Sequence, residues 1–487
     1  MAFDSLQELV SLLEERGELK RVSAPVSAEL EITEIVDRVS KGPAARNVAL
    51  FFENVKGHDM PVLVNAMGSA RRMAWALGVG ELDDLNRNLS ALLDTRLPQG
   101  LGDAATRGAG LWQALRSVGL RPQMVRRAPC QEIVHTDGAS LDELPILKCW
   151  PKDGGRYITL PQVITRDPVT GVRNVGMYRL QQLDARTLAM HWQRHKGGAE
   201  HERQARDKQA DRIPAAIALG GDPAETWCAS APLPPNVDEY LLAGWLRGKP
   251  VRFVRAVSQP LEVPAGADIV IEGYVDLGDR RLEGPFGDHT GYYTPPDYYP
   301  AFHVTAITRR RQAIYPATVV GRPPMEDYWM GKATERLFLP LMRLFQGEIV
   351  DVNMPAEGVF HNLVIVSIRK RFPGHAHKII YGLWGLGLMM LAKAIVVVDA
   401  TVDVQDLSEV AWRVLGNVDW RRDVIIADGP VDDLDHSAPR AAFGAKIGVD
   451  ATSKGPEDGH PRGWPEEVCN LDQIRELVDR RWQEYGL

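Results

Sequence analysis

Short runs of β-branched and aliphatic residues recur through the middle of this chain, and they constrain its fold more than any other feature. Glycine, proline, asparagine or aspartate stands at the corners between successive runs. Short strands spaced in this way are typical of a β-barrel or a β-sandwich. The runs cover residues 160–168, 172–183, 212–220, 251–257, 267–275, 301–310 and 313–320, and a helical segment, 237–248, interrupts them. We therefore predict a central β domain over 125–325.

The preceding residues, 1–124, mix helix and strand signals and contain a Gly-rich passage over 97–110, near which we place a boundary. A chain of 487 residues is too long for one core, so separate domains are expected. Ser5 and Glu8 have the spacing of a capping box at the start of a first helix. A second helix is predicted over 30–42, and strands over 48–55 and 61–67. These elements indicate an N-terminal α/β domain.

Strands and helices alternate over the remaining residues, 326–487. Strands are predicted over 362–368, 394–400 and 423–428, and helices over 375–392 and 406–416. This alternating order implies a parallel sheet covered on both faces, and hence a C-terminal α/β domain. A closing helix is expected to be capped by Asn470 or Asp472.

Charge and cysteine content exclude several classes of protein. Lys and Arg number 57 and Asp and Glu 64, a net charge of −7, which argues against a general nucleic-acid binder. The four cysteines are scattered without a C-x-x-C pair, so neither a disulfide framework nor a zinc ribbon is expected. The start does not have the pattern of a signal peptide, and no run approaches the ~18 apolar residues of a membrane span. We expect a cytoplasmic protein with, at most, peripheral contact with a membrane.

Two acids flank a Gly-Pro-Phe-Gly corner in the stretch RRLEGPFGDHTGYY, residues 280–293. Burial against Phe286 and the tyrosines can raise the pKa of a carboxyl, so that Glu283 or Asp288 could deliver a proton. Arg179 lies on a strand-like run, where a half-buried guanidinium needs a carboxylate or phosphate partner. A structural salt bridge is the alternative role for this arginine.

Asn174, His195 and Glu239 form a second group of candidates. His195 precedes two glycines that let the backbone approach a ligand, and Glu239 lies in the first turn of a helix, where free N–H groups suit phosphate. Together they are a mixed oxygen and nitrogen ligand set that fits Mn²⁺ or Mg²⁺ shared with a phosphate, although each residue alone is more often structural. By the period of a strand, Met177 and Arg179 share one face and Asn174 takes the other.

Several motifs of the chain resemble the UbiD family of reversible decarboxylases in order and spacing. They are N-V-G-M-Y-R (174–179), H-K-G-G (195–198), E-Y (239–240) after a Pro-rich loop and L-E-G-P-F-G-D-H-T-G-Y-Y (282–293). The first two predicted helices, G-R-P-P (321–324) and G-A-K-I-G-V-D-A-T-S-K (444–454) are also similar, so the resemblance covers nearly the whole chain. It is closest to the 3-polyprenyl-4-hydroxybenzoate carboxy-lyase group.

The resemblance implies a split β-barrel in the central domain that binds prenylated FMN with Mn²⁺ (or Mg²⁺) and K⁺. It implies metal ligation by Asn174, His195 and Glu239, and an acid–base network of Arg179, Glu283 and Asp288. Cofactor contacts are implied for Asn174, Met177, Tyr178, Arg179, Arg194, His195, Ser230, Ala231, Pro232, Glu239 and Lys393. Many family members have glutamate in place of Asp288, and aspartate there resembles the quinone-pathway members. The C-terminal domain is expected to close the active site and to carry contacts of a homo-oligomer, a dimer or a hexamer.

From these residues we expect a carboxy-lyase that acts without oxidation on an aromatic acid. Loss of CO₂ leaves an electron pair on a ring carbon that cannot stabilise it, and no amino acid supplies the electron sink that is needed. Asp288 is the expected proton donor, and Glu283 and Arg179 are expected to set its protonation and orient the substrate.

The expected substrate is a polyprenyl-hydroxybenzoate-like acid of ubiquinone or menaquinone biosynthesis, and a separate flavin prenyltransferase is expected to supply the cofactor. Three alternatives remain open from the sequence. They are a UbiD-type decarboxylase of a small aromatic or heteroaromatic acid, an FMN oxidoreductase, and a non-catalytic binding or assembly protein. The direction of the reaction, decarboxylation or carboxylation, is also open.

Overall fold

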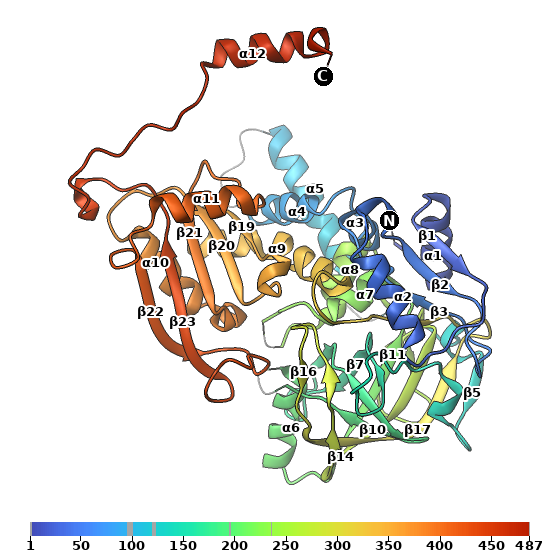
Figure 1. The fold of residues 1–487 in the computed structure, drawn as a ribbon. Helices are drawn as coiled ribbons and strands as arrows, with labels where there is room; N and C mark the ends of the chain where they lie inside the picture. Colours follow the sequence, from blue (N-terminus) through green and yellow to red (C-terminus); the bar gives the residue numbers. More distant parts are fainter. Residues whose placement is uncertain (1, 95–100, 119–122, 194–195, 235, 487) are drawn as a thin grey trace.

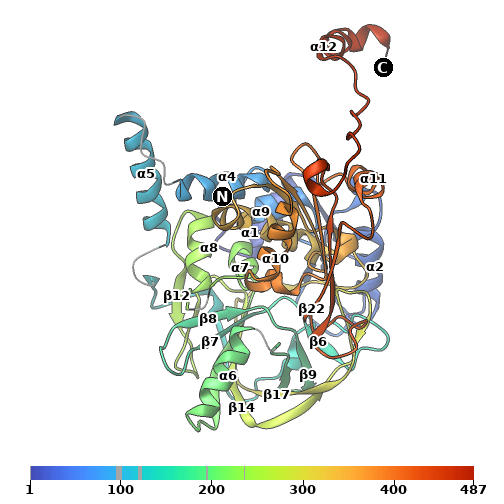
Figure 2. The same ribbon diagram turned by 90° about the vertical axis from the view of Figure 1, so that its left-hand side faces the viewer.

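The computed structural model describes residues 2–94, 101–118, 123–193, 196–234 and 236–486. Three sheets dominate it: a small N-terminal sheet, a large curled central sheet and a C-terminal sheet (Figures 1 and 2). The fold is therefore multidomain α+β, as the sequence predicts. In the part of the chain described, no helix is long and apolar enough to cross a membrane.

The N-terminal part begins with the capped helix that the sequence predicts. The side chain of Ser5, the N-cap of α1 (Leu6–Glu15), accepts a hydrogen bond from the backbone N–H of Glu8, and the Asp4 N–H donates to the Glu8 carboxylate. The first of these bonds satisfies an N–H group that the first turn of a helix leaves unpaired, and the second holds the residue before the cap. The face of α1 that packs into the core consists of Leu6, Leu9, Val10 and Leu13.

The N-terminal sheet has the strand order β1-β2-β3-β18. Its strands are β1 (Leu19–Val22), β2 (Ala49–Phe52), β3 (Val62–Val64) and β18 (Tyr315–Ala317). The other helices of this part are α2 (Glu31–Ser40), α3 (Ala70–Ala76), α4 (Asp83–Leu93) and α5 (Leu101–Val118). Because β18 comes from the end of the central stretch, the N-terminal and central parts share a sheet. From Leu101 on, the Gly-rich passage is the helix α5, whose alanines, leucines and arginines favour helix despite the glycines.

The central sheet has the order β6-β9-β10-β17-β14-β11-β7-β8, and each strand is antiparallel to its neighbours. These strands are β6 (Arg156–Ile158), β7 (Gln162–Arg166), β8 (Arg173–Gly176), β9 (Leu180–Asp184), β10 (Thr187–Met190), β11 (Arg212–Leu219), β14 (Ile269–Glu283) and β17 (Asp297–Arg309). A short strand, β5 (Ile133–His135), also pairs with β17. The sheet is the curled half-barrel that was predicted.

Its curl follows from one short connection. β8 lies at one end of the sheet and β9 lies next to the other end, yet only residues 177–179 separate them. A chain of this length spans at most about 14 Å, so the two ends of the sheet must lie close together. The predicted single strand over 172–183 is therefore wrong: it is two strands, one at an end of the sheet and one next to the other end. The expected shared face of Met177 and Arg179 does not apply.

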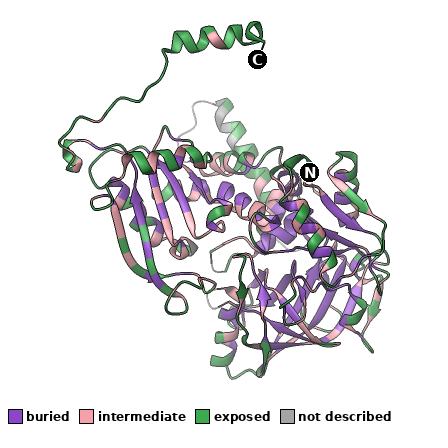
Figure 3. Cartoon of the chain, in the orientation of Figure 1, coloured by how far each residue is buried: buried purple, intermediate pink, exposed green. Residues whose placement is uncertain are grey.

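Smaller elements complete the central part. They are β4 (Gln123–Met124), β12 (Arg252–Arg255) and β13 (Glu262–Pro264) in one sheet, the ribbon β15 (Phe286–Gly287) and β16 (Tyr293–Thr294), and the helices α6 (Gly197–Asp207), α7 (Pro223–Cys228) and α8 (Glu239–Arg247). The strands of the half-barrel are largely buried (Figure 3). In β11, Ile213 and Ile217 face one core cluster and Ala216 faces another, so both faces of the sheet are covered.

The C-terminal sheet has the order β19-β20-β21-β23-β22. Its strands are β19 (Ile349–Asn353), β20 (Leu363–Ile368), β21 (Ala394–Asp399), β22 (Val424–Pro430) and β23 (Phe443–Asp450). β20, β21 and β23 run parallel, whereas β19 and β22 are antiparallel edges. The strand expected over 423–428 is thus an antiparallel edge, and the third parallel strand is β23. The glycines of β23 hide its strand pattern in the sequence. One of them, Gly448, allows close packing, because a Cβ there would lie 2.7 Å from Ile380 of a covering helix.

The C-terminal helices are α9 (Glu326–Phe345), α10 (His375–Trp384), α11 (Leu407–Asn417) and α12 (Asp472–Arg481). The helix expected over 375–392 ends at Trp384, before Gly385, and a 3-10 turn, Gly387–Leu391, follows. Leu471 is the N-cap of α12 and makes no side-chain cap, so neither Asn470 nor Asp472 has the predicted role. α12 stands away from the body at the end of an extended segment and has no buried residue (Figures 1 and 2).

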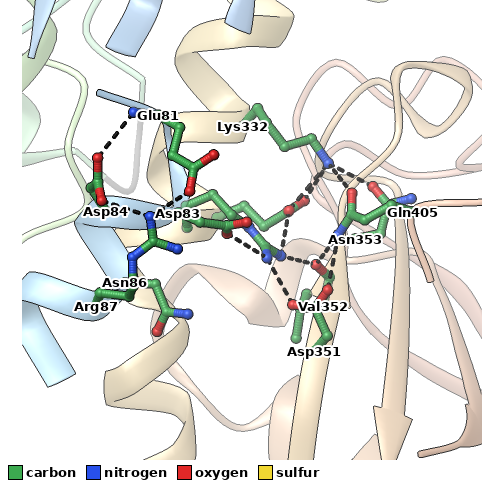
Figure 4. Close-up of polar contacts among 12 residues, drawn as sticks. Glu81, Asp83, Asp84, Asn86, Arg87, Lys332, Asp351, Val352, Asn353 and Gln405 are labelled. Atoms are coloured by element: carbon green, nitrogen blue, oxygen red, sulfur yellow. Dashed lines mark hydrogen bonds and ion pairs between the residues drawn. The ribbon is translucent and has the colours of Figure 1, made fainter. Parts of the chain in front are cut away.

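The long helix α9 joins the domains through buried polar contacts (Figure 4). Lys332 Nζ lies 2.9 Å from Glu335 on the same helix and 2.7 Å from Asn353 Oδ1 at the end of β19, and it also donates to Gln405. Each acceptor satisfies part of an ammonium group that burial would otherwise penalise. These contacts tie α9 to the C-terminal sheet.

Arg336, one turn further along α9, reaches both neighbouring domains. Its Nη1 lies 2.8 Å from Asp351 of β19 and 3.3 Å from Asp83 of α4, and its Nη2 lies 2.7 Å from Glu335. The same side chain is 8% exposed. One buried guanidinium therefore links the N-terminal helices, α9 and the C-terminal sheet.

Candidate active site

Arg179 and the two acids of the Gly-Pro-Phe-Gly corner are in direct contact. Arg179 Nε donates to Glu283 Oε1 at 2.7 Å and Nη2 donates to Oε2 at 3.1 Å, so this ion pair is bidentate. Arg179 Nη1 lies 2.5 Å from Asp288 Oδ2. No more than 9% of any of the three side chains is exposed. One buried cation is thus shared by two buried carboxylates.

The corner itself fixes the positions of the two acids. Glu283 is the last residue of β14, Phe286 lies on β15, and Asp288 follows directly. The guanidinium carbon of Arg179 lies 4.5 Å from the centroid of the Phe286 ring. Thr294 on β16 donates from Oγ1 to Asp288 Oδ2 at 2.8 Å. The ribbon β15–β16 therefore holds Asp288 against the arginine.

Each acid has a histidine on its other side. His191 Nδ1 lies 3.1 Å from Glu283 Oε2, and His289 Nδ1 lies 2.8 Å from Asp288 Oδ1. His289 Nε2 in turn lies 3.0 Å from Nε2 of His361, which comes from the C-terminal domain. Sequence reasoning missed these three histidines as site residues. His289 lies inside the quoted motif, but nothing local in the sequence indicates the contacts of His191 and His361.

The shared cation changes the expected protonation of the acids. Burial alone would raise the pKa of Asp288, but the hydrogen bond from His289 and the charges of His289 and Arg179 hold that pKa well below its usual range. Burial is likewise outweighed at Glu283, where bonds from His191 and Arg179 lower the pKa. These contacts favour the ionised form of both carboxyls, so the expectation that burial near Phe286 raises the pKa of one of them is not met.

A buried carboxylate suited to a cation lies near the other end of the sheet. Asp238 caps α8, and Glu239, its first residue, accepts a hydrogen bond from the backbone N–H of Val175 at 2.7 Å. Burial raises the pKa of Glu239 to about 8. Among the described residues no cationic side chain pairs with Glu239. A bound metal ion would supply the missing positive charge, so the site fits a divalent cation.

Asn174, the residue before Val175, faces the start of α6. A Cβ on Gly197 would lie 1.9 Å from Asn174 Oδ1, so only glycine allows this approach. The Tyr178 hydroxyl accepts a hydrogen bond from the Gly198 N–H at 3.0 Å. The structure therefore brings Asn174, Glu239 and the start of α6 together.

Arg194 and His195 lie outside the described residues. Within the described ranges no group of three His, Cys, Asp or Glu side chains could hold a metal.

The remaining predicted cofactor contacts fall in two places. The Met177 N–H donates to the carbonyl of Ala229 at 2.8 Å, which places the crossing segment 177–179 beside the loop that contains Ser230, Ala231 and Pro232. Lys393 lies in the C-terminal domain, at the start of β21, where its Nζ pairs with Asp435 at 2.8 Å. In this structure the lysine therefore has an acidic partner of its own domain.

Comparison with known proteins agrees with this fold. Family models of the 3-octaprenyl-4-hydroxybenzoate carboxy-lyase match in three parts: the N-terminal domain over residues 10–92, the Rift-related domain over 123–323 and the C-terminal domain over 328–451. An uncharacterized protein of Archaeoglobus fulgidus is 49% identical over 485 residues, covering 99% of each chain. One of Aquifex aeolicus is 48% identical and covers 100% of this chain and 99% of its own.

Solved structures are similar over nearly the whole length. Vanillic acid decarboxylase of Sedimentibacter hydroxybenzoicus in its closed form gives a TM-score of 0.87 at 27% identity, with 100% of both chains covered, and its open form gives 0.80. The UbiD-class enzyme HmfF of Pelotomaculum thermopropionicum in complex with FMN gives 0.80 at 29% identity, covering 98% of this chain and 99% of that one. The protein belongs to the UbiD family of carboxy-lyases.

Proposed function

We propose that this protein is a prenylated-FMN-dependent decarboxylase of an aromatic carboxylic acid. The observation that carries the proposal is the sharing of Arg179 by Glu283 and Asp288 at the rim of the half-barrel. Decarboxylation needs a cation for the substrate carboxylate and an acid for the product carbon, and this buried group contains both. HmfF, a relative, binds FMN or prenylated FMN in its solved structures.

The residues of this chain would act in a defined order. Arg179 would bind the substrate carboxylate and orient it. The prenylated flavin, when bound, supplies the electron sink for the pair left by the departing CO₂. Asp288 would then transfer a proton to that carbon, so that one C–C bond breaks and one C–H bond forms. Glu283, held by His191, would keep the arginine in place.

The metal and the phosphate of the cofactor would lie at the cation site beside β8. Asn174 and Glu239, with His195, would hold Mn²⁺ or Mg²⁺, and K⁺ is proposed as a second ion. Met177, Tyr178, Arg194 and the loop 230–232 would line the cofactor, and Lys393 would bind its phosphate in place of Asp435. The burial of the Glu239 carboxyl, which raises its pKa to about 8, supports this proposal.

The substrate class is proposed as a polyprenyl-hydroxybenzoate-like acid of quinone biosynthesis, because three matching family models carry the octaprenyl-hydroxybenzoate description. A small aromatic acid is the second candidate, since the chain superimposes well on a vanillic acid decarboxylase. A flavin prenyltransferase is proposed as the supplier of the cofactor. Assembly into dimers or hexamers is proposed, and an evolved form of HmfF is dimeric. Closure of the site by the C-terminal domain is proposed as well.

The test is to co-express the protein with a flavin prenyltransferase and to measure CO₂ release from a panel of acids. The panel contains prenylated and unprenylated hydroxybenzoates, vanillate and a furan carboxylate. We expect release of CO₂ without oxidation of NAD(P)H, and a prenylated flavin mass in the purified protein. NAD(P)H oxidation with ordinary FMN and no CO₂ release would instead indicate an oxidoreductase and contradict the proposal.

A further inference from the structure

The Gly-Pro-Phe-Gly corner, residues 284–287, contains two glycines and a proline, so most of its side chains cannot anchor the backbone that leads to Asp288. Other segments supply the anchors. The Gly287 N–H, one residue before Asp288, donates to Asp153 Oδ1 at 2.8 Å. The second carboxylate oxygen, Asp153 Oδ2, accepts a hydrogen bond from the Trp150 N–H at 2.8 Å. One carboxylate, 5% exposed, therefore joins the segment before β6 to the residue next to Asp288.

The indole ring of Trp150 is a second anchor for Gly287. A Cβ on Gly287 would lie 2.2 Å from Trp150 Cδ1, so the backbone lies directly against the ring and only glycine allows this approach. The same ring packs against Gly321 of the G-R-P-P motif, where a Cβ would lie 2.7 Å from Trp150 Cζ2. Trp150 Nε1 donates to the Val320 carbonyl at 2.8 Å. The loop that precedes α9 thus holds the tryptophan, and the tryptophan holds Gly287.

The first half of the corner has anchors of its own. The Gly284 N–H donates to Gln181 Oε1 at 2.7 Å, and the Tyr157 hydroxyl lies 3.0 Å from the Pro285 carbonyl oxygen. These two side chains come from β9 and β6 of the half-barrel. They fix the start of the corner, whereas Asp153 fixes its end.

A carboxylate suits this position because both of its oxygens are acceptors when it is ionised. Each oxygen of Asp153 faces a backbone N–H, and the Asp153 N–H donates to the Trp150 carbonyl at 3.0 Å. The segment 150–153 is therefore a tight turn closed by its own hydrogen bonds. Because a buried carboxylate is destabilising unless it is hydrogen-bonded, the turn and the corner hold each other in place.

We propose that Asp153 is a positioning residue for Asp288. The inference rests on the proposed decarboxylation, in which Asp288 delivers a proton to the carbon that loses CO₂. Successive Cα atoms are about 3.8 Å apart, so a displacement of Gly287 moves Asp288 as well. Glu283 precedes the corner on β14, and its bidentate pair with Arg179 does not use this bond. Substrate binding by Arg179 is therefore separable from proton delivery by Asp288.

The test compares Asp153→Ala with a matched control, Asp167→Ala. Asp167 is 7% exposed and accepts hydrogen bonds from the backbone N–H groups of Val169 and Thr170 at 2.7 and 2.8 Å. It closes the turn between β7 and β8 in the same half-barrel. Both substitutions remove a buried carboxylate and leave two backbone N–H groups without their acceptor, so both should destabilise the fold to a similar extent. Of the two residues, only Asp153 is bonded to the corner.

The variants are co-expressed with the flavin prenyltransferase and assayed for CO₂ release, and each rate is divided by the amount of bound flavin. We expect kcat of Asp153→Ala to fall at least about 10-fold with KM within about twofold of the wild type, because a small misplacement of a reacting group slows a reaction strongly. Asp167→Ala should match the wild type in both constants. Equal losses of kcat in the two variants, a rise of KM in place of a fall of kcat, or wild-type kcat in Asp153→Ala would overturn the proposal.

A second measurement needs neither cofactor nor substrate, so it separates failure of the positioning role from failure of the proposed function. It is amide hydrogen exchange at Gly287, followed by mass spectrometry with fragmentation to single residues. In the wild type we expect this N–H to exchange at least about 100-fold more slowly than in an unfolded peptide, as a buried and bonded amide does. The exchange should become at least about 10-fold faster in Asp153→Ala and stay unchanged in Asp167→Ala.

Rapid exchange at Gly287 in the wild type would overturn the positioning role whatever the assays show, and this outcome does not depend on whether a variant folds. Exchange that Asp153→Ala does not change would overturn it equally. A wild-type protein that protects Gly287 but releases no CO₂ from any acid of the panel would instead contradict the proposed function.

Discussion

Arg179 is a single cation between two buried carboxylates, and this sharing determines how the site responds to substitution. Its loss would leave Glu283 and Asp288 close together without the cation that they share. Among the residues that the structure describes, two histidines and a threonine would remain as side-chain partners. The arginine is therefore important for the stability of the fold as well as for the proposed chemistry.

We predict that Arg179→Ala lowers the free energy of unfolding by about 3–5 kcal/mol, the usual cost of leaving a buried charge without its partner. Urea unfolding monitored by tryptophan fluorescence measures this. Adding Glu283→Gln and Asp288→Asn to Arg179→Ala removes the orphaned charges and should recover part of the loss. Equal stability of the single and triple variants would contradict this account.

Stability should also depend on pH through His289. The folded-state pKa of His289 is raised, so its interaction with Asp288 stabilises the protein below the unfolded pKa of ~6.5 and the stabilisation disappears as pH rises through the folded pKa. We predict that His289→Asn is less stable than the wild type at pH 5.5 and that the difference shrinks towards pH 9. Denaturant titrations across this range measure it. A constant difference would show that His289 is not charged in the folded protein.

At the scale of the elements, the corner after β14 depends on a close approach of two backbones. The Gly154 N–H donates to the carbonyl of Pro285 at 2.7 Å, and a Cβ on Gly154 would lie 2.1 Å from the carbonyl oxygen of Gly284. Backbone cannot give way as a flexible side chain can. Gly154 therefore helps to fix the segment that joins Glu283 to Asp288.

We predict that Gly154→Ala displaces the corner and lowers kcat for CO₂ release at least tenfold, while the flavin still binds because the cation site lies elsewhere. Steady-state assays and the flavin spectrum test both parts. Gly416→Ala is the control, because nothing lies within 4 Å of a Cβ there and alanine favours its helix, α11. Wild-type kcat in Gly154→Ala would contradict the close packing of the corner.

The sequence predicts an individual helix or strand well where a single capping motif or apolar run defines it. The α1 cap and the apolar runs of β7, β11 and β17 follow from local spacing, and the structure has them. The break at 177–179 could not be predicted, because Met, Tyr and Arg fit a strand and only the closure of the sheet forces the crossing. β23 was missed because its glycines weaken the strand pattern in the sequence. Gly448 is needed for close packing against α10.

The same distinction applies to the site. Glu283 and Asp288 are recognisable because both acids lie in one short motif. The protonation of these acids was predicted wrongly because it depends on Arg179, His191 and His289, which meet only in the folded chain. His361 lies 72 residues beyond His289 in another domain, and only the tertiary structure places it there.

At the scale of the whole molecule, α9 and its buried charges determine how the C-terminal domain lies against the rest. Lys332 and Arg336 share Glu335 and reach groups of β19 and α4 (Figure 4). His361 reaches His289 of the candidate site across this junction. Contacts far from the chemistry are therefore expected to influence the site.

We predict that Arg336→Met lowers the free energy of unfolding by about 3–5 kcal/mol, because Glu335 and Asp351 lose a buried partner. Arg87→Met is the matched control: Arg87 is 56% exposed and pairs with Glu81 and Asp84 at the surface, so its loss should change the stability little. Denaturant unfolding of both variants measures the difference. Similar costs for the two substitutions would contradict a structural role for the junction.

The central claim is that Asp288, held by Arg179, gives a proton to the carbon from which CO₂ departs. The most direct test is deuterium incorporation into the product when the prenylated-flavin enzyme works in D₂O, compared between the wild type and Asp288→Asn. We predict one deuterium at the former carboxyl carbon in the wild type, and at least a 100-fold slower incorporation in Asp288→Asn with flavin still bound. Incorporation at the wild-type rate in Asp288→Asn would contradict the account.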